Sequence, residues 1–124
     1  MVMKRILVVD DEKTIRHLLG DLLSNDYQVT LAATGMEARQ CLDTDSFDLL
    51  ITDLVMPELN GVDLVMGLQK TQPALKIIAM SGGGGINGRF DYLPVAQLVG
   101  ASKILRKPFA LVDVSEAVKE LIGK

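Results

Sequence analysis

Five short apolar runs, each followed by a segment with helical periodicity, constrain the fold of this chain more than any other feature. The apolar runs occupy residues 6–9, 27–31, 47–51, 75–80 and 103–105. A continuous apolar run is typical of a parallel strand covered on both faces, whereas the alternating run at 27–31 is typical of an edge strand. The helical segments occupy residues 15–23, 35–42, 62–68, 92–99 and 111–122. This alternation predicts an α/β domain with a parallel sheet.

The composition is that of one globular domain. The chain has 124 residues, of which 48% are hydrophobic and 23% are charged, and we expect a single domain over residues 1–124. The net charge of -3 argues against binding to nucleic acid through bulk charge. No apolar run reaches the ~20 residues that a membrane span requires, and no signal peptide is visible, so we expect no membrane contact and a cytoplasmic location. The single cysteine, Cys41, excludes an internal disulfide framework.

Polar residues follow four of the predicted strands at the point where each strand ends. Asp10 and Asp11 follow the first, Asp53 the third, Ser81 the fourth and Lys107 the fifth. The carboxyl ends of parallel strands lie at one edge of a sheet, where ligands of open α/β sheets bind. Neighbouring strands are only ~4.8 Å apart, so we expect three carboxylates, a hydroxyl and an amine to converge there.

This set of side chains favours one kind of chemistry. Crowded carboxylates repel each other unless a cation joins them, and an all-oxygen ligand set is typical of Mg²⁺. A carboxylate beside that ion can attack phosphorus as a nucleophile, while Lys107 neutralises the phosphoryl oxygens. Taken singly, Asp10 and Asp11 also suit a helix N-terminus, Asp53 a turn and Lys107 a solvated surface. Their joint arrangement favours a metal and phosphoryl site.

Four motifs resemble the receiver domain of bacterial two-component response regulators, the CheY-like family. They are ILVVDDE at 6–12, DLLITDLVMPELNGVDL at 48–64, IIAMSG at 77–82 and KILRKPF at 103–109. The resemblance implies a three-layer, flavodoxin-like (βα)5 fold. Its five-stranded parallel sheet would have the order 2-1-3-4-5.

The resemblance also implies roles for the acidic residues. Asp53 matches the phosphoacceptor. Asp10 and Asp11 match the acid pair of the metal site, with Asp11 as the direct Mg²⁺ ligand and Asp10 acting through water. Val55 matches the position whose backbone carbonyl binds the metal.

Further positions match the phosphate side of the family's site. Ser81 matches the hydroxyl switch residue and Lys107 the phosphate-binding lysine, and the bond from Lys107 to Pro108 is expected to be cis. Ile104 departs from the family because that position often holds an aromatic switch residue. The glycines at 82–85 depart too, and they predict an unusually long loop before the fourth helix.

The function implied is that of a phosphorylated switch. Asp53 would accept a phosphoryl group from a histidine kinase or a histidine phosphotransfer protein, using Mg²⁺, and the change would alter binding to a downstream protein. Such a domain is a phosphoacceptor and no classical enzyme. Two alternatives are an unphosphorylated binding scaffold and a small phosphohydrolase that uses the same aspartate. The sequence leaves open the kinase, the output partner, the oligomeric state and whether the chain stands alone.

Overall fold

A computed structural model describes residues 3–56, 59–82 and 93–123. Its main sheet has five parallel strands in the order β2-β1-β3-β6-β7, which confirms the predicted order 2-1-3-4-5 when the sheet strands are counted along the chain. The strands are β1 (Arg5–Val9), β2 (Gln28–Ala32), β3 (Leu49–Asp53), β6 (Lys76–Ser81) and β7 (Lys103–Arg106).

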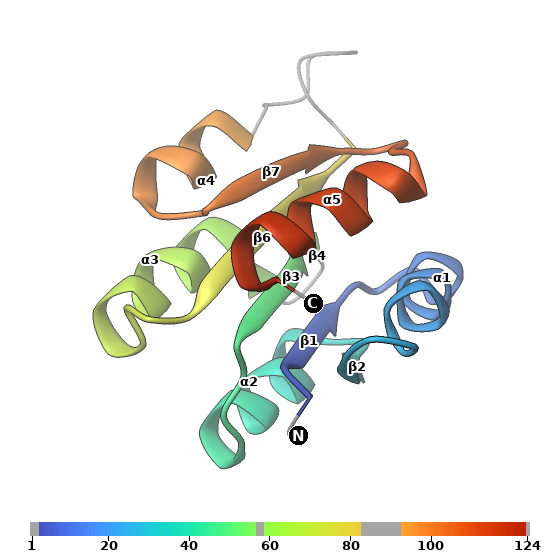
Figure 1. Ribbon diagram of the computed structural model, residues 1–124. Helices are drawn as coiled ribbons and strands as arrows, with labels where there is room; N and C mark the ends of the chain where they lie inside the picture. Colours follow the sequence, from blue (N-terminus) through green and yellow to red (C-terminus); the bar gives the residue numbers. More distant parts are fainter. Residues whose placement is uncertain (1–2, 57–58, 83–92, 124) are drawn as a thin grey trace.

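Helices cover both faces of the sheet, so the domain has the three predicted layers (Figure 1). One face carries α1 (Lys13–Leu23) and α5 (Leu111–Ile122), and the other carries α2 (Gly35–Thr44), α3 (Gly61–Thr71) and α4 (Leu93–Val99). Within the described ranges, no helix is long and apolar enough to cross a membrane.

Side chains of the central strands alternate between two apolar cores, one on each face of the sheet. Leu7 and Val9 belong to the core beneath α2, α3 and α4, whereas Ile6 and Val8 belong to the core beneath α1 and α5. All four residues are fully buried. Burial on both faces explains why this strand is apolar at every position.

Most element ends lie one to three residues from their predicted positions, and two features differ from the sequence prediction in ways that bear on the site. The third strand covers Leu49–Asp53 instead of 47–51, because backbone pairing with β6 continues to Asp53, beyond the last apolar residue. A short antiparallel pair, β4 (Val55–Met56) and β5 (Leu59–Asn60), was not predicted at all. The loop predicted around 82–91 lies almost entirely outside the described residues, as does residue 92 of the fourth predicted helix.

Candidate functional site

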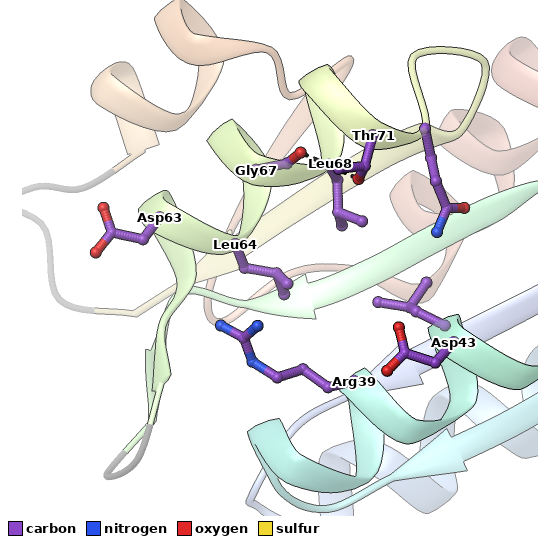
Figure 2. Close-up of a pocket in the computed structure, with 9 residues that line it drawn as sticks. Arg39, Asp43, Asp63, Leu64, Gly67, Leu68 and Thr71 are labelled. Atoms are coloured by element: carbon purple, nitrogen blue, oxygen red, sulfur yellow. Dashed lines mark hydrogen bonds between the residues drawn. The ribbon is translucent and has the colours of Figure 1, made fainter.

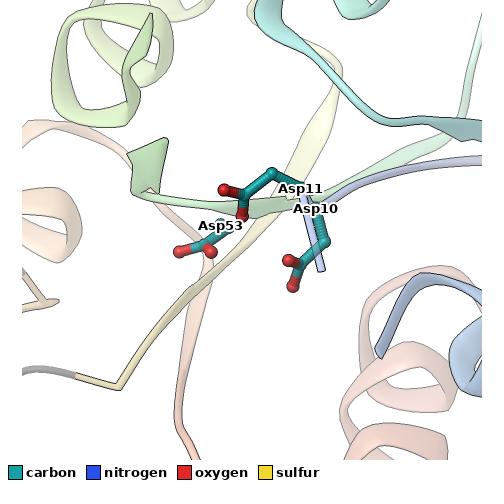
Figure 3. A group of neighbouring side chains, drawn as sticks. All are labelled: Asp10, Asp11 and Asp53. Atoms are coloured by element: carbon teal, nitrogen blue, oxygen red, sulfur yellow. The ribbon is translucent and has the colours of Figure 1, made fainter. Parts of the chain in front are cut away.

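Three carboxylates meet at the carboxyl ends of two neighbouring strands. Asp10 follows β1 and Asp53 is the last residue of β3, and the two strands pair up to Val9 and Thr52. One carboxylate oxygen each from Asp10, Asp11 and Asp53 lies within 4.8 Å of the others (Figure 3). The structure therefore brings together the three acids that the sequence singled out.

Asp10 is the most enclosed member of this cluster, with no exposed surface. Its Oδ1 accepts a hydrogen bond from the backbone N–H of Glu12 at 2.9 Å, and its Oδ2 accepts one from Lys107 Nζ at 2.8 Å. Both oxygens of this buried carboxylate thus have a donor, which is what a buried charge requires.

Lys107 connects the end of β7 with the acids. Its Nζ lies 2.8 Å from Asp10, 3.2 Å from Asp53 and 3.2 Å from Glu12. Burial alone lowers the pKa of Lys107, but the hydrogen bond to Asp10 and the charges of Asp53 and Asp10 outweigh it, so its pKa lies well above the usual lysine value. The lysine therefore holds a full positive charge in the site.

The surroundings of Asp53 disfavour the ionised form of its side chain. It is 6% exposed, and burial raises its pKa. Lys107 and the backbone N–H of Val55, which donates to Asp53 Oδ1 at 3.2 Å, lower that pKa, while the charge of Asp10 raises it. The net pKa is above the ordinary value. A cation beside these oxygens would relieve the cost, and the all-oxygen donor set fits a hard divalent ion.

A glycine fixes the backbone that follows Asp53. The N–H of Gly61 donates to the carbonyl of Leu54 at 3.0 Å, and Asn60 caps α3 by accepting from the N–H of Val62. A Cβ on Gly61 would lie 2.4 Å from Leu54 Cα, so no other residue fits here without movement. This contact anchors the start of α3 to the residue after Asp53.

Ser81 and Val55 both lie near Asp53, and the backbone N–H of Val55 donates to the Asp53 carboxylate. Ser81 is buried at the end of β6, one residue beyond the partner of Asp53 in the pairing of β3 with β6. Its carbonyl accepts from the N–H of Lys107 at 2.9 Å. The bond from Lys107 to Pro108 is cis, as expected.

Two residues near the acids had no role assigned from the sequence. Glu12 pairs with Lys107, and Arg16 Nη1 donates to the backbone carbonyl of Asp10 at 2.9 Å. Glu12 begins α1 as its N-cap, and Arg16 lies one turn further along that helix. The only signal in the sequence is their spacing from the acid pair, which does not specify the contacts.

A separate hollow of about 260 Å³ lies between α2 and α3 (Figure 2). Leu42, Leu64 and Leu68 form its apolar part, and the charged residues Arg39 and Asp63 also line it. None of the clustered acids lines it, so it is distinct from the site at the strand ends.

Comparison with known proteins agrees with this geometry. The family model of the response regulator receiver domain matches residues 6–119. The chain belongs to this family. The response regulator MprA of Mycobacterium ulcerans is 35% identical over 121 residues, which make up 97% of this chain and 50% of that protein. This receiver domain thus spans about half the length of the curated relatives it matches.

Solved receiver domains share the fold. A response regulator receiver domain protein from Clostridium thermocellum is 34% identical with a TM-score of 0.84, covering 97% of this chain and 94% of that one. Response regulator protein TrrA from Thermotoga maritima is 31% identical with a TM-score of 0.81, and the match covers 97% of this chain and 100% of that one. The structure of TrrA is a complex with Mg²⁺–BeF. The resemblance drawn from the four motifs is therefore confirmed.

Proposed function

We propose that Asp53 accepts a phosphoryl group from the phosphohistidine of a histidine kinase or a histidine phosphotransfer protein. The proposal rests above all on one observation. Oxygens of Asp10, Asp11 and Asp53 lie within 4.8 Å of one another, with the Lys107 ammonium 3.2 Å from Asp53. The Lys107 ammonium can neutralise the oxygens of a transferring phosphoryl group, and the three carboxylates suit a divalent cation that would do the same.

The transfer is a displacement at phosphorus. A carboxylate oxygen of Asp53 forms the new O–P bond while the P–N bond of the donor breaks. The imidazole nitrogen keeps the electron pair and takes up a proton from solvent. The product is an aspartyl phosphate, and hydrolysis of this acyl phosphate returns Asp53 to its free form.

The acids fit Mg²⁺ with unequal roles. Both oxygens of Asp10 already accept hydrogen bonds, which supports its acting through water, whereas Asp11 is exposed beside the cluster and suits direct binding. Asp53 and the backbone carbonyl of Val55 complete the protein ligands in this assignment. When bound, the ion neutralises charge on the acids and on the phosphoryl oxygens.

Lys107 and Ser81 act on the phosphoryl oxygens once the group is on Asp53. Lys107 supplies a fixed positive charge, and the hydroxyl of Ser81 supplies a hydrogen bond from the next strand. These contacts exist only in the phosphorylated state, so they bias the domain toward a second conformation that a downstream protein recognises. We assign this role to one receiver unit over residues 1–124, acting in the cytoplasm.

The residue two positions after Asp53 supports an acceptor over a phosphohydrolase. Val55 holds that position, and its exposed side chain has no acid or base that could activate water. Turnover of many substrate molecules is therefore not expected. We likewise expect no nucleic acid or membrane partner for this domain.

Phosphoryl uptake from a small donor tests the function. The purified chain is incubated with acetyl phosphate and Mg²⁺, and its intact mass is measured. We expect a gain of one phosphoryl group in the wild type and none in Asp53→Asn, because an amide is not a competent nucleophile. Uptake by Asp53→Asn at the wild-type rate would remove Asp53 as the acceptor.

A further inference from the structure

Lys107 has no hydrogen-bond donor to spare in this structure. A lysine ammonium offers three donors, and three carboxylates lie within hydrogen-bonding distance of its Nζ. The distances are 2.8 Å to Asp10, 3.2 Å to Asp53 and 3.2 Å to Glu12. Before Lys107 can bind a phosphoryl oxygen, one of these partners has to release it.

The three partners of Lys107 differ in how easily water can replace the lysine. Asp10 is fully buried, and a buried carboxylate that loses its cation is left poorly solvated. Asp53 carries the phosphoryl group itself in the proposed product, so Lys107 has to stay on the side of Asp53 to reach the phosphoryl oxygens. The Glu12 side chain is 61% exposed, so water can solvate its carboxylate when the contact breaks. Glu12 is also the N-cap residue of α1, yet its side chain makes no capping hydrogen bond to that helix.

We infer that Glu12 is the exchangeable partner of Lys107 and competes with the incoming phosphoryl oxygen for it. Glu12 is a positioning residue in this account, because it acts on the phosphoryl group only through Lys107. The inference rests on the proposed function and adds a residue to it. Removing the Glu12 contact leaves a donor of Lys107 free, so the phosphorylated state forms more readily.

Two substitutions separate this contact from the general effect of charge. Glu12→Ala removes both the carboxylate and the contact. Glu12→Asp keeps the charge but shortens the side chain, and aspartate at an N-cap accepts hydrogen bonds from the first turn of its own helix. Its carboxylate is thus drawn away from Lys107 while remaining near the site. Asp21→Asn, which removes an exposed acid further along α1, is the matched control for charge alone.

The experiment is calorimetric titration of each variant with beryllofluoride at saturating Mg²⁺, beside the rate of phosphoryl uptake from acetyl phosphate. Exposed ion pairs are weak, so we expect Glu12→Ala and Glu12→Asp each to bind beryllofluoride roughly 1.5- to 5-fold more tightly than the wild type. Asp21→Asn is expected to match the wild type. Uptake is expected to rise in the same two variants.

Three results would overturn the inference. Tighter binding by Glu12→Ala but wild-type binding by Glu12→Asp would show that charge matters and the contact does not. Unchanged or weaker binding by both would show that Glu12 does not compete for Lys107. A wild type that neither binds beryllofluoride nor takes up phosphate would refute the proposed function itself, and the inference with it.

Discussion

The contact between Gly61 and Leu54 leads to a sharp prediction for Gly61→Ala. The added Cβ would lie 2.4 Å from Leu54 Cα, 2.8 Å from its carbonyl oxygen and 2.9 Å from its Cδ2. Carbon atoms in contact normally lie about 3.5–4.0 Å apart, so the backbone itself has to move. The move also strains the hydrogen bond from the Gly61 N–H to the Leu54 carbonyl.

The expected loss follows from these opposing effects. Overpacking costs about 1–3 kcal/mol, and a strained hydrogen bond costs about 1 kcal/mol more. Alanine regains about 0.5–1 kcal/mol because it loses less conformational entropy than glycine in a helix. We therefore expect the free energy of unfolding to fall by about 1–3.5 kcal/mol.

Gly67 in the same helix provides the matched control for Gly61→Ala. A Cβ at Gly67 would meet nothing within 4 Å, so Gly67→Ala is expected to raise the free energy of unfolding by about 0.5–1 kcal/mol. Urea denaturation followed by circular dichroism compares the two variants. Because Leu54 directly follows Asp53, Gly61→Ala should also slow phosphoryl uptake, while Gly67→Ala should not. Equal stability of the two variants would refute the steric argument.

Two further predictions concern the acids. Because burial raises the pKa of Asp53, its charged form opposes folding, so Asp53→Asn should be more stable than the wild type at pH 7 without Mg²⁺. The difference should shrink as the pH falls through the raised pKa and vanish near about pH 3, where the carboxyl is protonated in both the folded and the unfolded state. Urea titrations at several pH values measure this difference in stability, and a difference that grows on acidification would contradict the prediction. Mg²⁺ at ~100 times its Kd should stabilise the wild type by about 2.7 kcal/mol, and Asp11→Ala should lose most of this at the same concentration. Thermal melts with Mg²⁺ or with a chelator test this, and equal stabilisation of both proteins would remove Asp11 from the site.

The sheet was predictable because its signal is local. Residues 6–9 are apolar at every position since alternate side chains enter cores on opposite faces. The pair of short strands after Asp53 was not predictable. Each has only two residues, and the adjoining hydrogen bond from the Gly61 N–H to the Leu54 carbonyl leaves no hydrophobic pattern in the sequence. The observed strand ends differ from the predicted ones because backbone pairing, and not hydrophobicity, determines where a strand ends.

The site was predictable only at the level of topology. Parallel strands bring Asp10 and Asp53 to one edge, and this follows from the order of elements along the chain. The sharing of Lys107 among three carboxylates depends on side-chain geometry between residues 54 to 97 positions apart. The bond from Arg16 to the Asp10 carbonyl likewise depends on where α1 begins. Neither contact corresponds to a residue pattern that could be recognised in the sequence.

Ile104 limits how a change at this site can reach the helical surface. It is half-buried on β7 and packs against the core that contains Leu93 and Ala96 of α4. The isoleucine side chain is restricted at χ1 by its branch at Cβ and carries neither a ring nor a hydroxyl, so it cannot swing inward as an aromatic residue does. The backbone of β7 is tied to β6 through the hydrogen bond from the Lys107 N–H to the Ser81 carbonyl. Since Ser81 and Lys107 are the two residues expected to close on a phosphoryl group, we expect the signal to travel by movement of these two strand ends. Rotation at position 104 is not needed for it.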